Sequence, residues 1–520
     1  MTGSVDAERV PWKTWLAVLG SSLGAFMAVL DIQIVNASLA EIQGSLAAGI
    51  DEAGWISTSY LVAEIVVIPL TGWLAQVFSI RNYVIANAIL FVVFSLACGT
   101  AQSLEQMIAL RALQGFTGGV LIPMAFTVIL TSLPKSKQPV GIAMFAVSAT
   151  FAPAIGPTIG GYLTEAFSWQ AIFYVNILPG ALMVAMLWYA LEPAPMQLAK
   201  LRTGDWAGVA TLAVGLGALQ TVLEEGNRKD WFGSPFIVRL SLVAAVSLAA
   251  CLWIELRRAE PLLNLRLLAR RNFGLGVLST FLLGAAMYGS VFVLPVYLAR
   301  MQGYNAEQIG HVLAWTGLPQ LLVIPLVPRL MQRVDARWVI ATGFGLFSLS
   351  CFMNTGLTLD YASDQLFVPN VVRAVGQALI LTPLAAISTA SIERAAAGSA
   401  SALFNMLRNL GGAIGIATLQ TVLTRREQFH SNVLSHGVSA FGDATRARLH
   451  ELTQYFAAQG SSSVQASREA VIALGRSVRE QAYAMAFADV FFLLGAALLV
   501  ALLATLLLGR EQQLQTGAGH

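Results

Sequence analysis

Charged residues are scarce in this chain. Asp, Glu, Lys and Arg make up 11% of its 520 residues, whereas 56% are hydrophobic, a balance that suits lipid rather than water. Cysteine is rarer still: Cys98, Cys251 and Cys351 stand in separate apolar runs, so their spacing predicts neither a disulfide framework nor a metal cluster. The formal net charge of +3 is too small to indicate a nucleic-acid partner.

Signatures of catalysis are absent as well. The sequence has no HExxH, no GxSxG and no phosphate-binding loop, and its five histidines are scattered. We therefore expect neither an enzyme nor a bound cofactor or metal. A channel is also disfavoured, because no re-entrant segment resembling a selectivity filter is visible.

Long apolar runs are what the sequence does contain. A bilayer core takes about 20 apolar residues per helix, and runs of that length recur from Trp15 to Leu508. The alternating pattern of a β-barrel is absent, so helices must satisfy the backbone in lipid, and we expect an all-α polytopic membrane protein. Breaks at polar, glycine, proline and charged clusters give fourteen transmembrane helices, at approximately 13–38, 53–76, 82–101, 105–132, 138–164, 168–191, 205–224, 236–257, 273–300, 306–331, 336–356, 366–391, 397–425 and 484–508.

Basic residues collect in every second connection between these spans. The even connections are rich in Lys and Arg, such as Lys135 and Arg266, whereas the short odd ones carry little beyond Arg228, Lys229 and Arg300. By the positive-inside rule, this asymmetry places both termini in the cytoplasm. We expect a multi-pass protein of the cell inner (plasma) membrane.

One odd connection, residues 427–480, is long and is therefore expected outside the cell membrane. Within it, Leu449, Leu452 and Phe456 share one helical face. This pattern predicts a short helix, either a simple surface helix or one that docks a partner.

An internal repeat divides the chain. Residues 65–87 align without gaps with residues 321–343, which pairs Pro69 with Pro325. Repeats of this kind build two rocking bundles around a site near the bilayer midplane in secondary transporters. We expect three parts: a six-helix bundle in 1–192, an inserted helix pair with linkers in 193–260, and a second six-helix bundle in 261–520 that includes the extracytoplasmic loop 427–480.

Several charged residues fall inside the apolar spans. Burying a charge at a helix centre costs about 2.5–3.5 kcal/mol on insertion scales, so Asp31, Glu64, Arg111, Arg373 and Arg408 each need a partner, water or a function. Asp31 is a candidate proton carrier, because a carboxylate removed from water exchanges its proton near neutral pH. Its alternative is a structural role, as the partner of Arg111 or of a helix end. Arg408 is expected to pack its guanidinium against carbonyls or a carboxylate.

Three polar residues are candidates for contact with substrate. Glu64 reads as a second proton site, an anchor for cationic substrate or a neutral, hydrogen-bonded acid, and its repeat counterpart is Gln320. Asn36 is a further candidate, although helix contacts are its simpler role.

The sequence resembles the major facilitator superfamily, specifically its fourteen-helix drug:proton antiporter branch of the EmrB/QacA type. The motifs that carry this resemblance are "LDIQIVNASLAEI", "PLTGWLAQVFSIRNYV", "RALQGFTGGVLIP", "APAIGPTIGGYL" and "FNMLRNLGGAIGIA". The resemblance implies the major facilitator fold, with two six-helix bundles plus two inserted helices. It also implies proton coupling at Asp31 and Arg111.

Gating and helix packing are likewise implied by the resemblance. The gating motif contains Gly72 and Arg81, the fourth-helix motif contains Gly115, and the antiporter motif contains Gly156, Pro157, Gly160 and Gly161. This chain departs from the gating motif, which usually has an acid and a basic pair where Gln76, Val77 and Ile80 stand, and a glycine where Ser79 stands.

The function expected is proton-driven export of amphipathic small molecules across the inner membrane by alternating access, with no cofactor beyond the proton gradient. The cavity between the halves is expected to open inward, and a periplasmic adaptor with an outer-membrane channel is a partner that the resemblance implies. The alternative is a dedicated exporter of one metabolite, siderophore or fatty acid on the same fold.

Overall fold

The computed structural model describes residues 10–258, 261–439 and 441–509 and is built from helices, with no strand among those residues. Thirteen helices in this part of the chain are long and apolar enough to cross a membrane. The core helix α19 (Ala397–Gly437) falls outside that group because Arg408 and several Asn and Gly residues lower its hydropathy. The thirteen helices and α19 make fourteen, and the predicted number of transmembrane helices is confirmed.

Helices of the first half pack against one another around α6. They are α1 (Trp12–Ala37), α4 (Trp55–Phe78), α5 (Ile80–Cys98), α6 (Leu104–Ser132), α7 (Gln138–Ala166) and, as one broken span, α8 (Ala171–Tyr174) with α9 (Ile177–Ala190). Two short helices, α2 (Leu39–Ser45) and α3 (Ile50–Ala53), join α1 to α4.

Two helices lie between the halves in sequence, α11 (Trp206–Glu225) and α12 (Pro235–Arg257), preceded by the short α10 (Ala199–Thr203). They pack on each other, and α11 also lies against α4. The outer helix α12 has few buried residues, as expected for a helix surrounded by lipid.

Helices of the second half repeat the arrangement around α13 and α19. They are α13 (Arg271–Met301), α14 (Ala306–Val323) continued by α15 (Val327–Met331), α16 (Ala336–Met353), α17 (Ser363–Ala378) continued by α18 (Leu381–Thr389), α19, and α21 (Ser463–Leu506). The repeat is imperfect at its matched prolines. Pro69 lies inside the continuous α4, whereas Pro325 lies in the 3₁₀ turn that separates α14 from α15.

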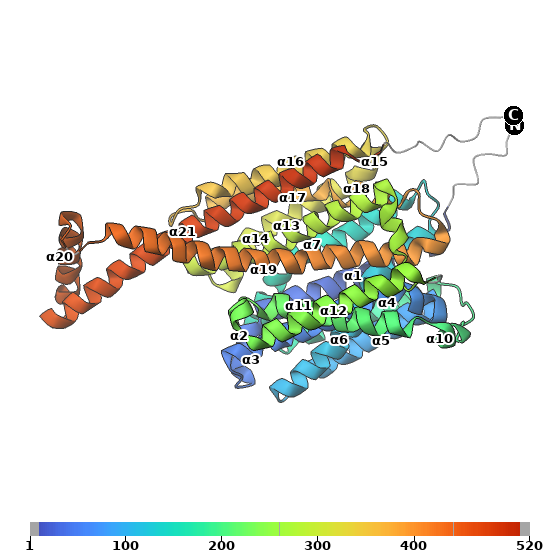
Figure 1. The fold of residues 1–520 in the computed structure, drawn as a ribbon, viewed down its shortest axis with the longest axis horizontal. Coiled ribbons are helices and arrows are strands. Elements are labelled where there is room, and N and C mark those ends of the chain that lie inside the picture. The colour runs from blue at the N-terminus through green and yellow to red at the C-terminus, as the bar shows by residue number, and fades with distance from the viewer. Residues whose placement is uncertain (1–9, 259–260, 440, 510–520) are drawn as a thin grey trace.

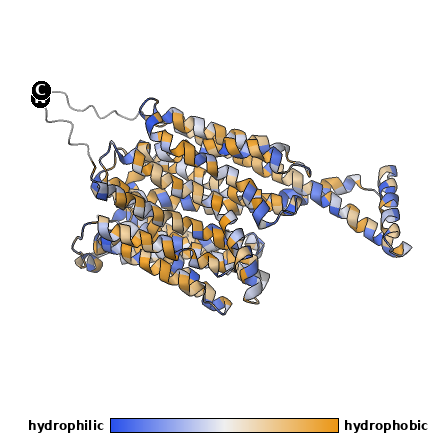
Figure 2. Ribbon diagram, turned by 180° about the vertical axis from the view of Figure 1, so that it is seen from behind, coloured by the Kyte–Doolittle hydropathy of each residue, from blue (hydrophilic) through white to orange (hydrophobic). Residues whose placement is uncertain are grey.

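The connection 427–480 is largely helical rather than the long loop predicted from the sequence. There α19 and α21 continue beyond the body as helices of 41 and 44 residues, and α20 (Asp443–Ala458) links them as the predicted short helix (Figure 1). No proline occurs between Ala397 and Leu506, so nothing in the sequence stops these helices at the membrane surface. We call residues 427–480 the arm, and Figure 2 shows that α20 is its most hydrophilic part.

The body thus has two distinguishable ends. The arm projects from one, the arm end, and α1 begins and α21 ends at the other, the terminal end.

Candidate functional site

A cavity of about 540 Å³ lies between the two halves, toward the arm end. One wall comes from the first half through Gln33, Asn36 and Pro157, and the facing wall comes from α13 and α19. The inserted pair closes a third side with the end of α11. We call this space the central cavity.

At the terminal end the halves are in contact. The Ser401 hydroxyl donates to the carbonyl of Pro123 at 2.7 Å, and the rings of Phe126 and Phe404 stack with centroids 5.4 Å apart. Gly72 meets Gly398 so closely that a Cβ on Gly72 would lie 2.9 Å from the Gly398 carbonyl carbon. The cavity is therefore closed at the terminal end.

Asp31 and Arg111 are brought together inside the first half. The Arg111 Nη1 donates to the Asp31 Oδ2 at 2.6 Å. The other carboxylate oxygen, Oδ1, accepts from the amides of Gln114 at 3.0 Å and Asn176 at 2.8 Å. Asp31 and Arg111 are each 1% exposed, so this ion pair is held in place by hydrogen bonds on both oxygens.

Close helix packing gives this ion pair its geometry. A Cβ on Gly115 would lie 2.3 Å from the backbone oxygen of Tyr60, so only glycine lets α6 approach α4 here. The Tyr60 ring consequently lies 4.2 Å from the Arg111 guanidinium carbon, within cation–π distance.

Glu64 lies on the terminal-end side of the central cavity, at the contact of α4 with α19. It is 3% exposed, and its Oε1 accepts from the Asn409 amide at 3.2 Å, a bond that joins the two halves. It does not line the central cavity in this state.

Arg408 is fully buried beside this bond. Its guanidinium carbon lies 5.6 Å from the centre of the Phe145 ring. A carbonyl or carboxylate was expected to accept hydrogen bonds from Arg408. Among the described residues, none accepts from any of its three guanidinium nitrogens.

The two predicted substrate amides differ in position. Asn36 lines the central cavity and accepts from the Ser57 hydroxyl at 2.6 Å. Gln320 is instead 0% exposed inside the second half, where its amide donates to Gln377 at 3.1 Å. It does not line the central cavity, because the helix face that carries it packs against α17.

The predicted gating and packing residues lie at helix contacts. Arg81 donates to the carbonyl of Trp188 at 3.1 Å, a contact within the first half. A Cβ on Gly156 or Gly160 would clash with α1, at 2.3 Å from Gln33 Cβ and 2.8 Å from the Ile34 oxygen. Gly161 is buried on the same helix.

The carboxylates at the end of α11 were not among the predicted site residues. Glu224, Glu225 and Arg228 line the central cavity, and Glu225 forms an ion pair with Arg228 and accepts from Thr58 at 3.4 Å. Two adjacent acids at the end of an apolar span were the available signal. No group of three or more His, Cys, Asp or Glu side chains within the described residues is arranged to hold a metal.

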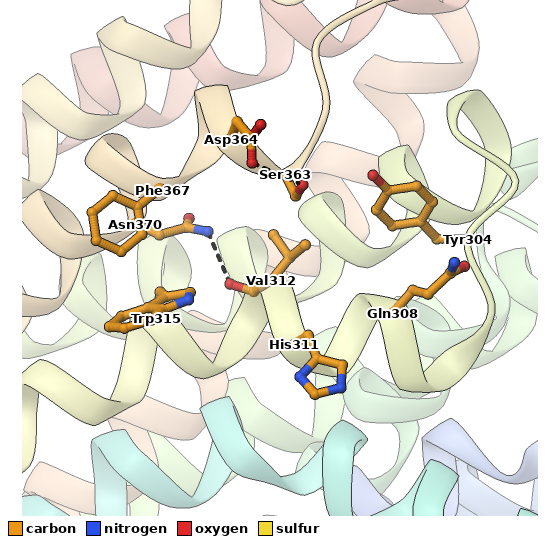
Figure 3. A pocket seen from close by; sticks show the side chains of 9 residues that line it. All are labelled: Tyr304, Gln308, His311, Val312, Trp315, Ser363, Asp364, Phe367 and Asn370. Atoms are coloured by element: carbon orange, nitrogen blue, oxygen red, sulfur yellow. Dashed lines mark hydrogen bonds between the residues drawn. The ribbon is translucent and has the colours of Figure 1, made fainter.

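A second cavity, of about 590 Å³, lies within the second half between α14 and α17 (Figure 3). Trp315 and Phe367 meet edge to face there, with centroids 4.8 Å apart, and the Asn370 amide donates to the carbonyl of Val312 at 3.1 Å. All of its lining residues belong to one half, so it is not the space between the halves.

Comparison with protein families places this geometry in a known class. The model of the Major Facilitator Superfamily matches residues 21–416, and the chain therefore belongs to that superfamily. Two solved structures share the fold: the human organic anion transporter MFSD10 (12% identity, TM-score 0.59, 95% of this chain and 99% of that one) and the proton:xylose symporter XylE (13%, 0.59, 95% and 95%).

Within the superfamily the chain is similar to EmrB-type exporters. It is 31% identical to the colistin resistance protein EmrB of Acinetobacter baumannii over 99% of this chain and 100% of that one. It is 30% identical to the fatty acid resistance protein FarB of Neisseria gonorrhoeae (96% and 97%) and to the multidrug export protein EmrB of Escherichia coli K12 (84% and 85%).

Proposed function

We propose that this protein exports several amphipathic small molecules across the inner (plasma) membrane in exchange for protons. Its similarity to multidrug export proteins along nearly the whole chain supports multidrug efflux. The observation that carries proton coupling is the Asp31–Arg111 ion pair buried inside the first half. No cofactor takes part, because the proton gradient supplies the free energy.

Both termini are cytoplasmic in this proposal, so the arm end faces outward. Asp31 lies near the arm-end terminus of α1 and Arg111 near that of α6, which brings the carboxylate close to protons from outside. Protonation removes the charge that Arg111 binds, and the first half then favours another packing. Proton and substrate are coupled because each binds the two states with different affinity.

The test is proton release from inverted membrane vesicles with an acid interior, challenged with cationic, neutral and anionic drugs. Drugs are expected to release protons from wild type and not from Asp31→Asn. Release of protons from wild type without any drug, or wild-type behaviour of Asp31→Asn, would show that Asp31 is structural.

A second candidate is a dedicated exporter of one compound, such as a fatty acid, a metabolite or a siderophore. The similarity to FarB, which is named for fatty acid resistance, favours this alternative. A substrate profile limited to one chemical class in the vesicle assay would select it.

A periplasmic adaptor that leads to an outer-membrane channel is the partner we propose for the arm. The helices of the arm carry apolar side chains that no other described residue covers. They include Phe429, Val433, Val471 and Ile472, each at least half exposed. Cross-linking from cysteines at these positions in the native membrane is expected to capture an adaptor, and cross-linking to lipid alone would refute the partnership.

A further inference from the structure

Arg408 lies at the boundary between the halves, where no described residue accepts a hydrogen bond from its guanidinium. The side chain is 0% exposed, and none of its nitrogens has a hydrogen-bond partner in the described part of the chain. A guanidinium removed from water loses its hydration, and only an acceptor with matching geometry compensates for that loss.

Glu64 is the nearby carboxylate, yet it does not fill this role. It is an electrostatic neighbour of Arg408, but its hydrogen bond comes from the adjacent Asn409. The two side chains therefore neutralise each other at a distance, while the guanidinium donors stay available.

A continuous helix face connects Arg408 to the central cavity. Positions 408, 412, 416 and 420 are spaced four apart on α19, and Ile416 and Gln420 line the cavity. Between them, Gly412 leaves room for the ring of Tyr288, since a Cβ there would lie 2.4 Å from that ring. Tyr288 also lines the cavity, so it separates the cavity from the guanidinium.

We propose that Arg408 binds the anionic group of an amphipathic organic carboxylate in the translocation path, and that Glu64 is the counter-charge which the substrate displaces. Movement of Tyr288, or separation of α4 from α19 when the terminal end opens, gives the ligand access. This inference rests on the proposed export function, whose substrate class it names.

Binding is tested on the purified full chain in lipid nanodiscs by calorimetry. The probes are 2-naphthoate and 2-naphthamide, which have nearly the same size and differ in charge. Wild type is expected to prefer naphthoate, and Arg408→Gln to reduce naphthoate affinity about 10- to 100-fold, the range for a charge-assisted hydrogen bond, without changing naphthamide affinity. No preference in wild type, or an unchanged preference in Arg408→Gln, overturns the proposal.

Substitutions of Glu64 distinguish recognition from simple charge balance. Glu64→Gln removes the competing carboxylate, so naphthoate affinity is expected to rise, whereas Glu64→Gln with Arg408→Gln is expected to remain weak. Recovery of naphthoate binding in the double variant would show that Arg408 only neutralises Glu64. Arg373→Gln is the matched control, because it also removes a buried arginine of the second half, and it should not alter the naphthoate preference.

Transport separates this inference from the proposed function. In the vesicle assay, Arg408→Gln should lose proton exchange with carboxylate drugs and keep it with cationic drugs. If no drug of any charge releases protons from wild type, the export function fails, while the binding result still decides the role of Arg408.

Discussion

At the scale of single residues, the two halves treat buried charge differently. In the first half every oxygen of the Asp31 carboxylate has a donor. In the second half, by contrast, none of the three guanidinium nitrogens of Arg408 has a hydrogen-bond partner among the described residues, whereas Arg111 lacks one only at Nε. The first arrangement is rigid and suits a two-state switch, whereas the second leaves donors for an exchangeable partner.

The ion pair predicts a non-additive effect on stability. Asp31→Asn leaves the Arg111 charge buried without its partner, which is expected to cost about 3–5 kcal/mol of unfolding free energy. Asp31→Asn with Arg111→Gln removes both charges and should cost less than Asp31→Asn alone. Thermal unfolding of the purified variants measures this, and equal or additive losses would mean that the two side chains are not energetically coupled.

Ser79 provides a second prediction. It caps the N-terminus of α5 with φ +66° and ψ 148°, and its hydroxyl accepts from the backbone N–H of Asn82 at 3.4 Å. Such a backbone costs a non-glycine residue about 1–3 kcal/mol, whereas replacing a serine cap by glycine costs only a few tenths of a kcal/mol. Ser79→Gly is therefore expected to raise the unfolding temperature, while Ser79→Ala lowers it, and the opposite order would exclude strain at this turn.

At the scale of elements, hydrophobic runs allowed the sequence to predict where helices cross the membrane. They did not predict where α19 and α21 end, because polar residues stop a membrane span but do not stop a helix. Short helices such as α20 were predictable from the spacing of Leu449, Leu452 and Phe456, since that spacing reflects a buried face. All three are half-buried in the structure, on the helix that packs against α21.

That face of α20 can be tested separately from the body. Leu452→Ser with Phe456→Ser should release α20 from α21 and make trypsin cleavage at Arg446 and Arg448 faster, with no change in the unfolding temperature of the membrane body. Tyr455→Ser is the matched control, because Tyr455 is 56% exposed on the same helix. Equal cleavage of both variants would show that α20 is not held by this face.

At the scale of the whole molecule, the sequence predicts two halves from its internal repeat, but it carries no signal for which end is closed. The closing contacts are between residues far apart in sequence, such as Ser401 with Pro123, and no local pattern records them. The same reason applies to Gln320, the repeat counterpart of Glu64: the repeat identifies equivalent positions, not equivalent environments, and Gln320 is buried inside the second half.

Closure of the terminal end gives the last prediction. Gly72→Val adds a side chain against Gly398 and is expected to hold this end open. The reporter is Thr389→Cys, because Thr389 is 4% exposed in the closed state. Maleimide should label this cysteine several-fold faster when Gly72→Val is also present. Gly44→Val is the control, because a Cβ there meets nothing within 4 Å. The native cysteines are buried and give little background, and an unchanged labelling rate would mean that Gly72 does not control closure.

The arm has a mechanical consequence. Both α19 and α21 belong to the second half and pass unbroken from the membrane body into the arm, so the arm is a rigid lever fixed to that half. Any rotation of the half is magnified at α20, in proportion to the lever's length. A protein attached to α20 would therefore be displaced each time the second half rotates.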